Sequence, residues 1–215
     1  MRNLGIDEAG RGPVMGPLVI AGVLCDDQEE LRALGVRDSK KLSPQRRRGL
    51  AQEIRRMAEC KVLLISAAEL DRGMEGASLN LLEAAYFAEI IRDLAPDKAW
   101  VDCCDTSEKR FRNHILRELG YELPMTVEHG ADERYPVVSA ASIIAKVKRD
   151  EEMRRISEEL GEPVGSGYAH DPQTVAFLEG WLRSRGKIPP HTRSGWKTSK
   201  RLLAKAKLRR LTEWE

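Results

Sequence analysis

The chain has 215 residues, a net charge of +2 and 41% hydrophobic residues. That length suits one sizeable domain or a domain with a modest appendage, and the apolar content is enough for a buried core. Because the sequence has no run of about 18 apolar residues and no signal-peptide pattern, we expect a cytoplasmic protein with no membrane span.

The first half of the chain is predicted to contain three strands and two helices. Residues 3–7 and 14–25 read as strands around a glycine-rich turn, and the second is a continuous apolar run that suits a sheet covered on both faces. A helix over residues 43–59 is indicated by Ser43, a good N-cap, and by Pro44 at the first helical position. A strand over 61–70 and a helix over 78–94 follow.

The second half alternates strands with helices and ends in helices alone. Strands are expected over 98–105 and 121–129, and helices over 107–120, 137–160, 172–185 and 197–211. This order predicts a mixed α/β sheet flanked by helices, with a helical C-terminal extension.

Charge is distributed unevenly along the chain. Residues 180–215 carry eleven Lys or Arg and two Glu, a net charge of +9, which leaves −7 on the rest of the chain. A basic arm on an acidic body is typical of a protein that binds a polyanion, although a solvated surface helix has the same composition.

Acidic residues follow three of the predicted strands. Asp7 and Glu8 end the first, Asp102 and then Asp105 end the fourth, and Asp132 lies in the loop after the last. Ligand sites gather at strand ends in α/β folds, so these carboxylates converge if the three strands are neighbours. Carboxylates held together raise one another's pKa values, and a divalent cation relieves that repulsion. Two such ions about 3.5–4 Å apart are suited to cutting a phosphodiester bond.

Asp7 and Glu8 are consecutive in a predicted strand, so their side chains should point to opposite faces. Either the chain turns at Glu8, which Gly10 would permit, or one of the two residues contributes its backbone carbonyl. The glycines of "GIDEAGRGPVMG" (5–16) suit a backbone that approaches a ligand closely.

Six segments that span nearly the whole chain carry a family resemblance. They are "GIDEAGRGPVMGPLV" (5–19), "VRDSKKLSPQRR" (36–47), "VDCCD" (101–105), "ADERYPVVSAASIIAKVKRD" (131–150), "GSGY" (165–168) and "GWKT" (195–198). In this order they closely resemble ribonuclease HII, the type 2 ribonuclease H family, in its archaeal form. The resemblance implies a ribonuclease H-like catalytic domain over residues 1–165 and a basic helical extension over 166–215, packed on it and binding substrate.

The resemblance also implies an activity. Members of the family hydrolyse the RNA strand of RNA–DNA hybrids and cut 5′ to single ribonucleotides in duplex DNA. They use Mg²⁺ or Mn²⁺, with two ions in the catalytic complex, and leave a 3′-hydroxyl and a 5′-phosphate.

Residue roles are carried over by motif position. The catalytic and metal-binding acids fall on Asp7, Glu8, Asp102 and Asp132, and Asp102 ranks above Asp105 because the first acid of "VDCCD" matches the catalytic position. The Gly-Arg-Gly element falls on Gly10, Arg11 and Gly12, and the junction-sensing tyrosine on Tyr168. Further expected substrate contacts are Ser39, Lys40, Lys146 and Lys197.

These residue types suit the implied roles. Glycine backbone can approach the ribose 2′-hydroxyl, which distinguishes RNA from DNA. Arg11 can clamp a neighbouring phosphate, and Tyr168 offers a flat face and a hydroxyl to a sugar. Lysines position a duplex through its phosphates without reading its sequence.

The chain departs from the family pattern at three places. Cys103 and Cys104 replace small residues, which suggests sensitivity to oxidation beside the site. Gly130 stands where archaeal relatives tend to carry lysine. His170 follows the tyrosine loop where Pro-Ser is frequent, and we expect it to be a surface residue.

Three other functions account for part of this sequence pattern. A resolvase or transposase core also uses an acidic cluster on this kind of sheet, but would leave the Gly-Arg-Gly and "GSGY" elements without a purpose. A dinucleotide-dependent enzyme is disfavoured because the glycine spacing is G-x-G-x-x-x-G rather than G-x-G-x-x-G. A non-enzymatic protein that binds nucleic acid through its basic tail predicts salt-sensitive binding without cleavage.

The C-terminus raises the question of a protein partner. Leu208, Leu211 and Trp214 have the spacing of a degenerate sliding-clamp motif, but a helix that packs its own apolar face fits them better. We expect a monomer that binds RNA–DNA hybrids and ribonucleotide-containing DNA, with a sliding clamp as a secondary partner.

Overall fold

A computed structural model describes residues 1–36 and 42–212, with side chains as far as residue 204. The chain divides into two compact units. The first unit comprises Met1–Ala9, Val19–Leu64 and Gly76–Lys148, and the second comprises Gly10–Leu18, Ile65–Glu75 and Arg149–Glu215. The functional division expected at residue 165 is a separate matter and stays a prediction. Among the described residues, no helix is long and apolar enough to cross a membrane.

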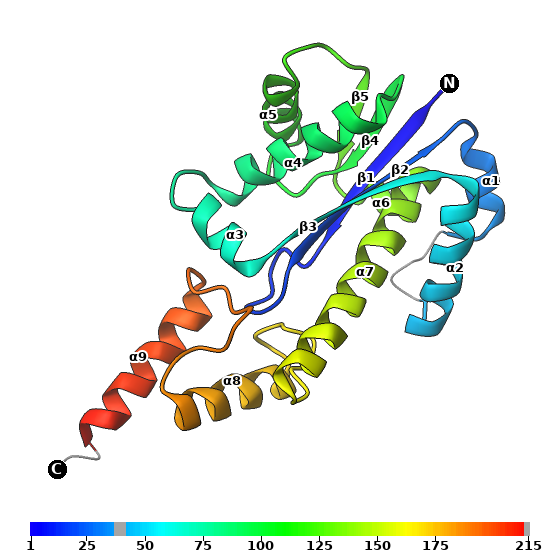
Figure 1. The fold of residues 1–215 in the computed structure, drawn as a ribbon. Coiled ribbons are helices and arrows are strands. Elements are labelled where there is room, and N and C mark those ends of the chain that lie inside the picture. The colour runs from blue at the N-terminus through cyan, green and yellow to red at the C-terminus, as the bar shows by residue number, and fades with distance from the viewer. Residues whose placement is uncertain (37–41, 213–215) are drawn as a thin grey trace. The chain divides into compact units, whose positions relative to one another are not determined.

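A five-stranded mixed sheet forms the centre of the first unit, as the sequence predicts (Figure 1). Its order is β3-β2-β1-β4-β5, and the strands are β1 (Asn3–Ala9), β2 (Leu18–Cys25), β3 (Glu59–Ile65), β4 (Lys98–Asp102) and β5 (Met125–Glu128). β1 pairs with β2 antiparallel, whereas β1 with β4 and β4 with β5 are parallel. The three strands that lead to the predicted acids are therefore neighbours, and their carboxyl ends share one edge.

Helices cover both faces of this sheet (Figure 1). α4 (Leu79–Leu94) and α5 (Glu108–Leu119) lie on one face, where the rings of Phe87 and Phe111 meet edge to face at 5.4 Å. The other face is covered by α1 (Gln28–Ala33), α2 (Pro44–Met57) and the part of α7 (Pro136–Leu160) that belongs to the first unit, preceded by the short α6 (Ala131–Arg134).

Two glycines allow the helices to approach the sheet closely. A Cβ on Gly5 would overlap the backbone of Val137, so β1 and α7 pack in direct contact. A Cβ on Gly22 would overlap the side chain of Ile90, and the sheet meets α4 there. Gly5 and Asp7 share a face of β1, so Asp7 points toward α7.

The predicted ends of most elements agree with the structure to within a few residues. Ser43 caps α2 by accepting from the N–H of Arg46 at 3.2 Å, and Gly120 ends α5 in the left-handed conformation. The strand predicted over 61–70 is wrong beyond Ile65. There the Ser66 and Glu69 side chains form a reciprocal capping box, which starts α3 (Ala67–Gly73).

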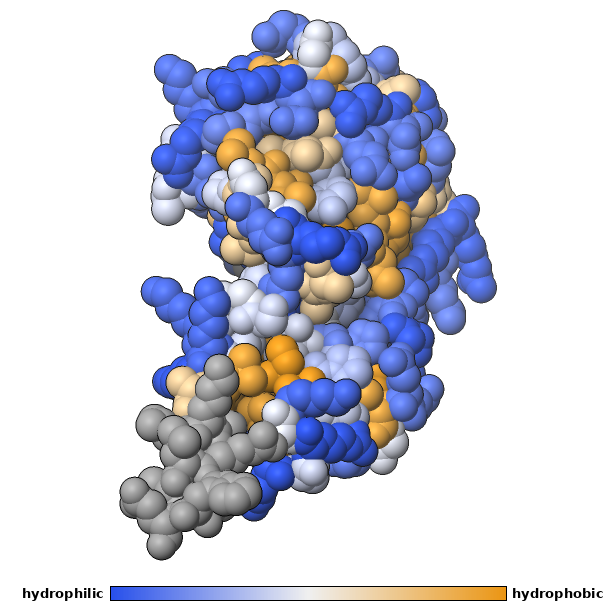
Figure 2. All heavy atoms as spheres, turned by 60° about the vertical axis from the view of Figure 1, so that its left-hand side comes forward, coloured by the Kyte–Doolittle hydropathy of each residue, from blue (hydrophilic) through white to orange (hydrophobic). Residues whose placement is uncertain are grey.

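The second unit has its own apolar core. Met15, Ile156, Phe177 and Trp181 are among its buried residues. It contains α3, the end of α7, α8 (Pro172–Arg185) and α9 (Lys197–Thr212). Of these, α8 and α9 agree with the predicted helices over 172–185 and 197–211. Hydrophilic residues dominate the face of the molecule drawn in Figure 2, as the charged fraction of 33% leads one to expect.

Candidate active-site residues in two groups

The first group is centred on Asp7, near the end of β1. This carboxylate is only 5% exposed, and Ser142 and Lys146 of α7 lie beside it. Burial, and next to it the charge of Asp102, raise the pKa of Asp7 from 3.8 to about 7, and Asp132 adds to the rise. A hydrogen bond with Ser142 and the charge of Lys146 oppose this increase. Lys146 also donates to the Ser142 hydroxyl at 2.6 Å.

Asp102 and Asp132 come from the two parallel strands on one side of β1: Asp102 ends β4, and Asp132 lies in α6, which follows β5. The Oδ1 of Asp102 accepts from the N–H of Ala131 at 2.7 Å, which ties the end of β4 to the start of α6. Asp132 is 6% exposed, and its carbonyl accepts from the Ser139 hydroxyl. The structure thus brings three of the four predicted acids together.

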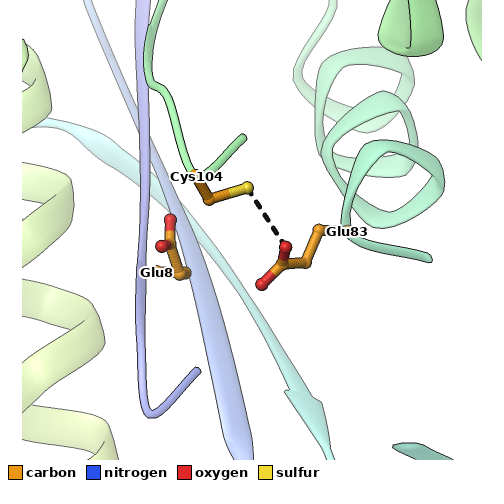
Figure 3. A group of neighbouring side chains, drawn as sticks. All are labelled: Glu8, Glu83 and Cys104. Atoms are coloured by element: carbon orange, nitrogen blue, oxygen red, sulfur yellow. Dashed lines mark hydrogen bonds between the residues drawn. The ribbon is translucent and has the colours of Figure 1, made fainter. Parts of the chain in front are cut away.

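Glu8 lies with a different set of residues (Figure 3). The ligand atoms of Glu8, Glu83 and Cys104 all lie within 4.8 Å of one another, and Cys104 Sγ donates to Glu83 Oε2 at 3.1 Å. β1 continues through Ala9, so the predicted alternative of a turn at Glu8 is wrong. The strand alternation that places Asp7 against α7 sends the Glu8 side chain toward Glu83 on α4.

Asp105 has a structural role. It is 3% exposed, and Arg110 Nε donates to its Oδ2 at 2.9 Å. This hydrogen bond holds the pKa of Asp105 well below its usual range. Arg110 donates to both oxygens of Asp105, and the choice of Asp102 over Asp105 as a cation ligand stays a prediction.

The Asp7 group has the donor chemistry of a divalent cation site. Oxygen ligands from carboxylates are those that Mg²⁺ and Mn²⁺ prefer. Burial is the first cause of the raised pKa of Asp7, and the charges of Asp102 and Asp132 add to it, so three carboxylates act on one another here. Carboxylates held together in this way fit a divalent cation.

The second group is the glycine loop, residues 10–16, and it belongs to the second unit. Gly10 has a φ of +89°, and a Cβ there would lie 2.6 Å from the carbonyl oxygen of Pro17. Only glycine suits that position. The loop is held by the carbonyl of Gly167, which accepts from the N–H groups of Val14 at 2.9 Å and Met15 at 3.1 Å.

Tyr168 follows directly and is half-buried. Its Cε1 would be 3.9 Å from a Cβ built on Gly12, so ring and glycine face each other. The guanidinium of Arg149 lies 5.0 Å from the ring centroid, and its Nη2 donates to the Ser166 carbonyl at 2.7 Å. His170 is exposed, as predicted, and its ring centroid lies 5.3 Å from that of Tyr168.

Four further residues were predicted to contact the substrate: Arg11, Ser39, Lys40 and Lys197. Arg11 is partly exposed in the glycine loop, and Lys197 is an exposed residue at the start of α9. Ser39 and Lys40 lie outside the described residues. The sequence did not single out Glu83, Arg149 or Arg193, although a glutamate in an apolar helix face was a readable signal for Glu83.

Comparisons with known proteins agree on one family. Residues 4–199 match the family model described as Ribonuclease HII. A curated relative of that name from Archaeoglobus fulgidus is 48% identical over 201 residues, which are 94% of this chain and 96% of the relative.

Two solved structures share the fold. Ribonuclease H2 of Pyrococcus horikoshii has a TM-score of 0.89 at 41% identity and covers 96% of this chain and 99% of its own. The Archaeoglobus fulgidus structure described as a PCNA:RNase HII complex has a TM-score of 0.86 at 47% identity, over 92% of this chain and 96% of its own.

Proposed function

Since this chain belongs to the ribonuclease HII family and is a metal-dependent ribonuclease H, we propose that it cuts 5′ to single ribonucleotides embedded in duplex DNA, as well as the RNA strand of hybrids. The products would be a 3′-hydroxyl and a 5′-phosphate. The observation that supports this most is the placement of the buried Asp7 beside Asp102 and Asp132, because three neighbouring carboxylates are suited to hold divalent cations.

The proposed cation ligands are Asp7, Glu8, Asp102 and Asp132, with Mg²⁺ or Mn²⁺ as the ions. Two such ions, when bound, would activate a water and stabilise the departing oxygen of the phosphodiester. Asp7, Asp102 and Asp132 offer side-chain carboxylates from three adjacent elements, β1, β4 and α6. For Glu8 the backbone carbonyl is the remaining route, since its side chain lies with Glu83 and Cys104.

Lys146 supports the same group from α7. Its ammonium lowers the pKa of Asp7 and bonds to Ser142, and so keeps part of the negative charge balanced before substrate arrives. We propose that the same ammonium contacts a phosphate of the duplex, a charge-assisted contact that positions without specifying sequence.

The glycine loop and Tyr168 would recognise the ribonucleotide. Backbone without a Cβ at Gly10 and Gly12 admits a ribose 2′-hydroxyl at hydrogen-bond distance. The Tyr168 ring faces Gly12, so a sugar between them would meet a flat apolar surface on one side and peptide groups on the other. Ser39, Lys40 and Lys197 stay proposed phosphate contacts.

One assay tests this function. A labelled DNA duplex with a single ribonucleotide is incubated with Mg²⁺, Mn²⁺ or EDTA, beside an all-DNA duplex of the same sequence. We expect a cut 5′ to the ribonucleotide with either ion, and none with EDTA. An intact ribonucleotide duplex under every metal condition would reject the proposal, whereas a cut hybrid together with an intact single-ribonucleotide duplex would reject only its finer part.

A sliding clamp is a second proposed partner. The solved relative from Archaeoglobus fulgidus is described as a PCNA:RNase HII complex. The residues proposed to contact a clamp here are Leu208, Leu211 and Trp214, whose side chains lie outside the described part. Gel filtration of the full chain with a clamp, beside a chain ending at residue 204, is the test. Co-elution that the truncation abolishes supports the partner, and separate elution of the full chain rejects it; the same experiment reports whether the chain is a monomer.

A further inference from the structure

A fully buried arginine supports the glycine loop. Arg193 is 0% exposed, and its guanidinium donates to three carbonyls of this loop. Nε donates to Gly16 O at 3.0 Å, Nη1 to Arg11 O at 3.0 Å and Nη2 to Gly10 O at 2.6 Å. All four residues belong to the second unit. Burying a charge is unfavourable unless hydrogen bonds offset the lost hydration, and these three hydrogen bonds to the loop do so.

The planar fork of arginine suits this task. Its N–H groups diverge in fixed directions and can meet separate acceptors at once, whereas the ammonium of lysine is a compact charge at the end of a flexible stem. Arg193 itself is fixed by its backbone, whose N–H donates to Val14 O at 2.9 Å and whose carbonyl accepts from Ser199 Oγ at 2.6 Å.

The geometry of the trans peptide determines where the N–H groups of this loop point. In a trans peptide the C=O of one residue and the N–H of the next point in opposite directions. Because the carbonyls of Gly10 and Arg11 point at Arg193, the N–H groups of Arg11 and Gly12 must point away from it. Two successive N–H groups on one side of a loop form a concave donor pair for an oxygen ligand.

We propose that Arg193 is a positioning residue for ribonucleotide recognition: it fixes the Gly10 and Arg11 peptides so that the N–H groups of Arg11 and Gly12 face a ribose hydroxyl. This inference rests on the proposed role of the glycine loop as the reader of the ribose. Arg193 touches no substrate in this scheme, and it acts only through the loop.

The test separates recognition from folding by measuring a ratio. In an inactive Asp7→Asn background, the dissociation constants of a single-ribonucleotide duplex and of the matching all-DNA duplex are measured by fluorescence anisotropy. Adding Arg193→Lys should reduce the preference for the ribonucleotide duplex by about fivefold, as expected for one lost hydrogen bond, and change all-DNA binding less than twofold. A merely structural role would weaken both duplexes equally.

Asp71→Ala is the matched control. Asp71 holds the residues next to Arg193 by accepting from the N–H of Ser194 at 2.7 Å and of Gly195 at 3.0 Å, so its hydrogen bonds go to this segment rather than to the glycine loop. Its loss should leave the preference unchanged. A reduction as large as that of Arg193→Lys would overturn the inference, because any loosening of the segment would then suffice.

The outcomes distinguish this inference from the function on which it rests. If the Asp7→Asn protein shows no preference for the ribonucleotide duplex, ribose reading by the loop fails. If the preference is present and survives Arg193→Lys, only the role of Arg193 fails. Should Arg193→Lys not melt cooperatively, the guanidinium Nε–H resonance of Arg193 in the Asp7→Asn protein decides: a shift with the ribonucleotide duplex alone supports the inference, and no shift or equal shifts with both duplexes overturn it.

Discussion

The two units of the molecule balance their polar groups in opposite ways. In the first unit, Asp7 is buried beside Asp102 and Asp132, and Lys146 does not cancel their charges. In the second unit, the carbonyls of the glycine loop already meet the guanidinium of Arg193. A cluster of carboxylates gains its compensating charge only when a ligand binds. A loop whose carbonyls are already hydrogen-bonded has its shape before the ligand binds. This difference fits the proposal that the first group binds cations and that the second reads a sugar.

Removing the central acid of the first unit should have the largest effect. Asp7→Asn keeps the shape of the side chain but removes a charged cation ligand, so we expect cleavage to fall by about 10³-fold or more with binding of the duplex retained. Initial rates and anisotropy on the same duplex measure both quantities. Asp93→Asn, which removes an exposed carboxylate that pairs with Lys61, is the charge-matched control and should cleave normally.

The raised pKa of Asp7 should also make the stability of the protein depend on pH when EDTA removes divalent cations. The pKa of Asp7 is raised to about 7 in the folded chain, so this group favours folding below pH 4, and that contribution is lost as the pH rises toward 7. The free energy of unfolding of the native chain, relative to Asp7→Asn, should fall over that interval by a few kcal/mol at most. Urea unfolding at a series of pH values measures it. A flat difference would show that the negative charges are already balanced, and Mg²⁺ should restore the loss.

In the second unit, truncation of Tyr168 should affect cleavage of one substrate more than that of another. Tyr168→Ala removes the surface that faces Gly12, and we expect kcat/KM for a single-ribonucleotide duplex to fall by about tenfold, with a smaller fall for a continuous hybrid. Tyr168→Phe separates the ring from the hydroxyl. Equal losses on both substrates would place Tyr168 in general duplex binding rather than in ribose reading.

The smallest effect is expected from the thiols. Burial raises the pKa of the Cys25, Cys60 and Cys103 thiols, to about 11 for the first two, so little thiolate exists at pH 7. Iodoacetamide should label the folded chain slowly and change cleavage less than twofold, whereas a urea-unfolded sample should label at all four cysteines. A marked loss of cleavage in parallel with labelling would establish the oxidation-sensitive site that the sequence suggests.

Much of the first group was readable in the sequence because its causes are local. Apolar runs that end in Asp7 and Asp102 identify two strands, and their parallel pairing brings the carboxyl ends to one edge. The end of the third strand was missed, although Ser66 and Glu69 have the spacing of a capping box and announce a helix there. Competing local signals, not long-range contacts, account for that error.

The contacts that hold the glycine loop in place could not be predicted from the sequence. Arg193 lies in a basic tail whose composition suggests a solvated surface, yet its acceptors Gly10, Arg11 and Gly16 are 177 to 183 residues earlier in the chain. The same holds for Glu83, which meets the Cys104 thiol 21 residues later. Contacts of this kind are fixed by tertiary packing, and no spacing rule records them.

Gly5 has a consequence for the chemistry two residues away. Its single hydrogen acts as the spacer between β1 and α7, and α7 carries the hydroxyl and the ammonium that temper the Asp7 acid. The strength with which this edge of the sheet attracts metal is therefore tuned by a helix-to-sheet distance rather than by the ligands alone. A wider gap at residue 5 would move Lys146 away from Asp7 and leave less positive charge beside the acids, with every carboxylate still in place.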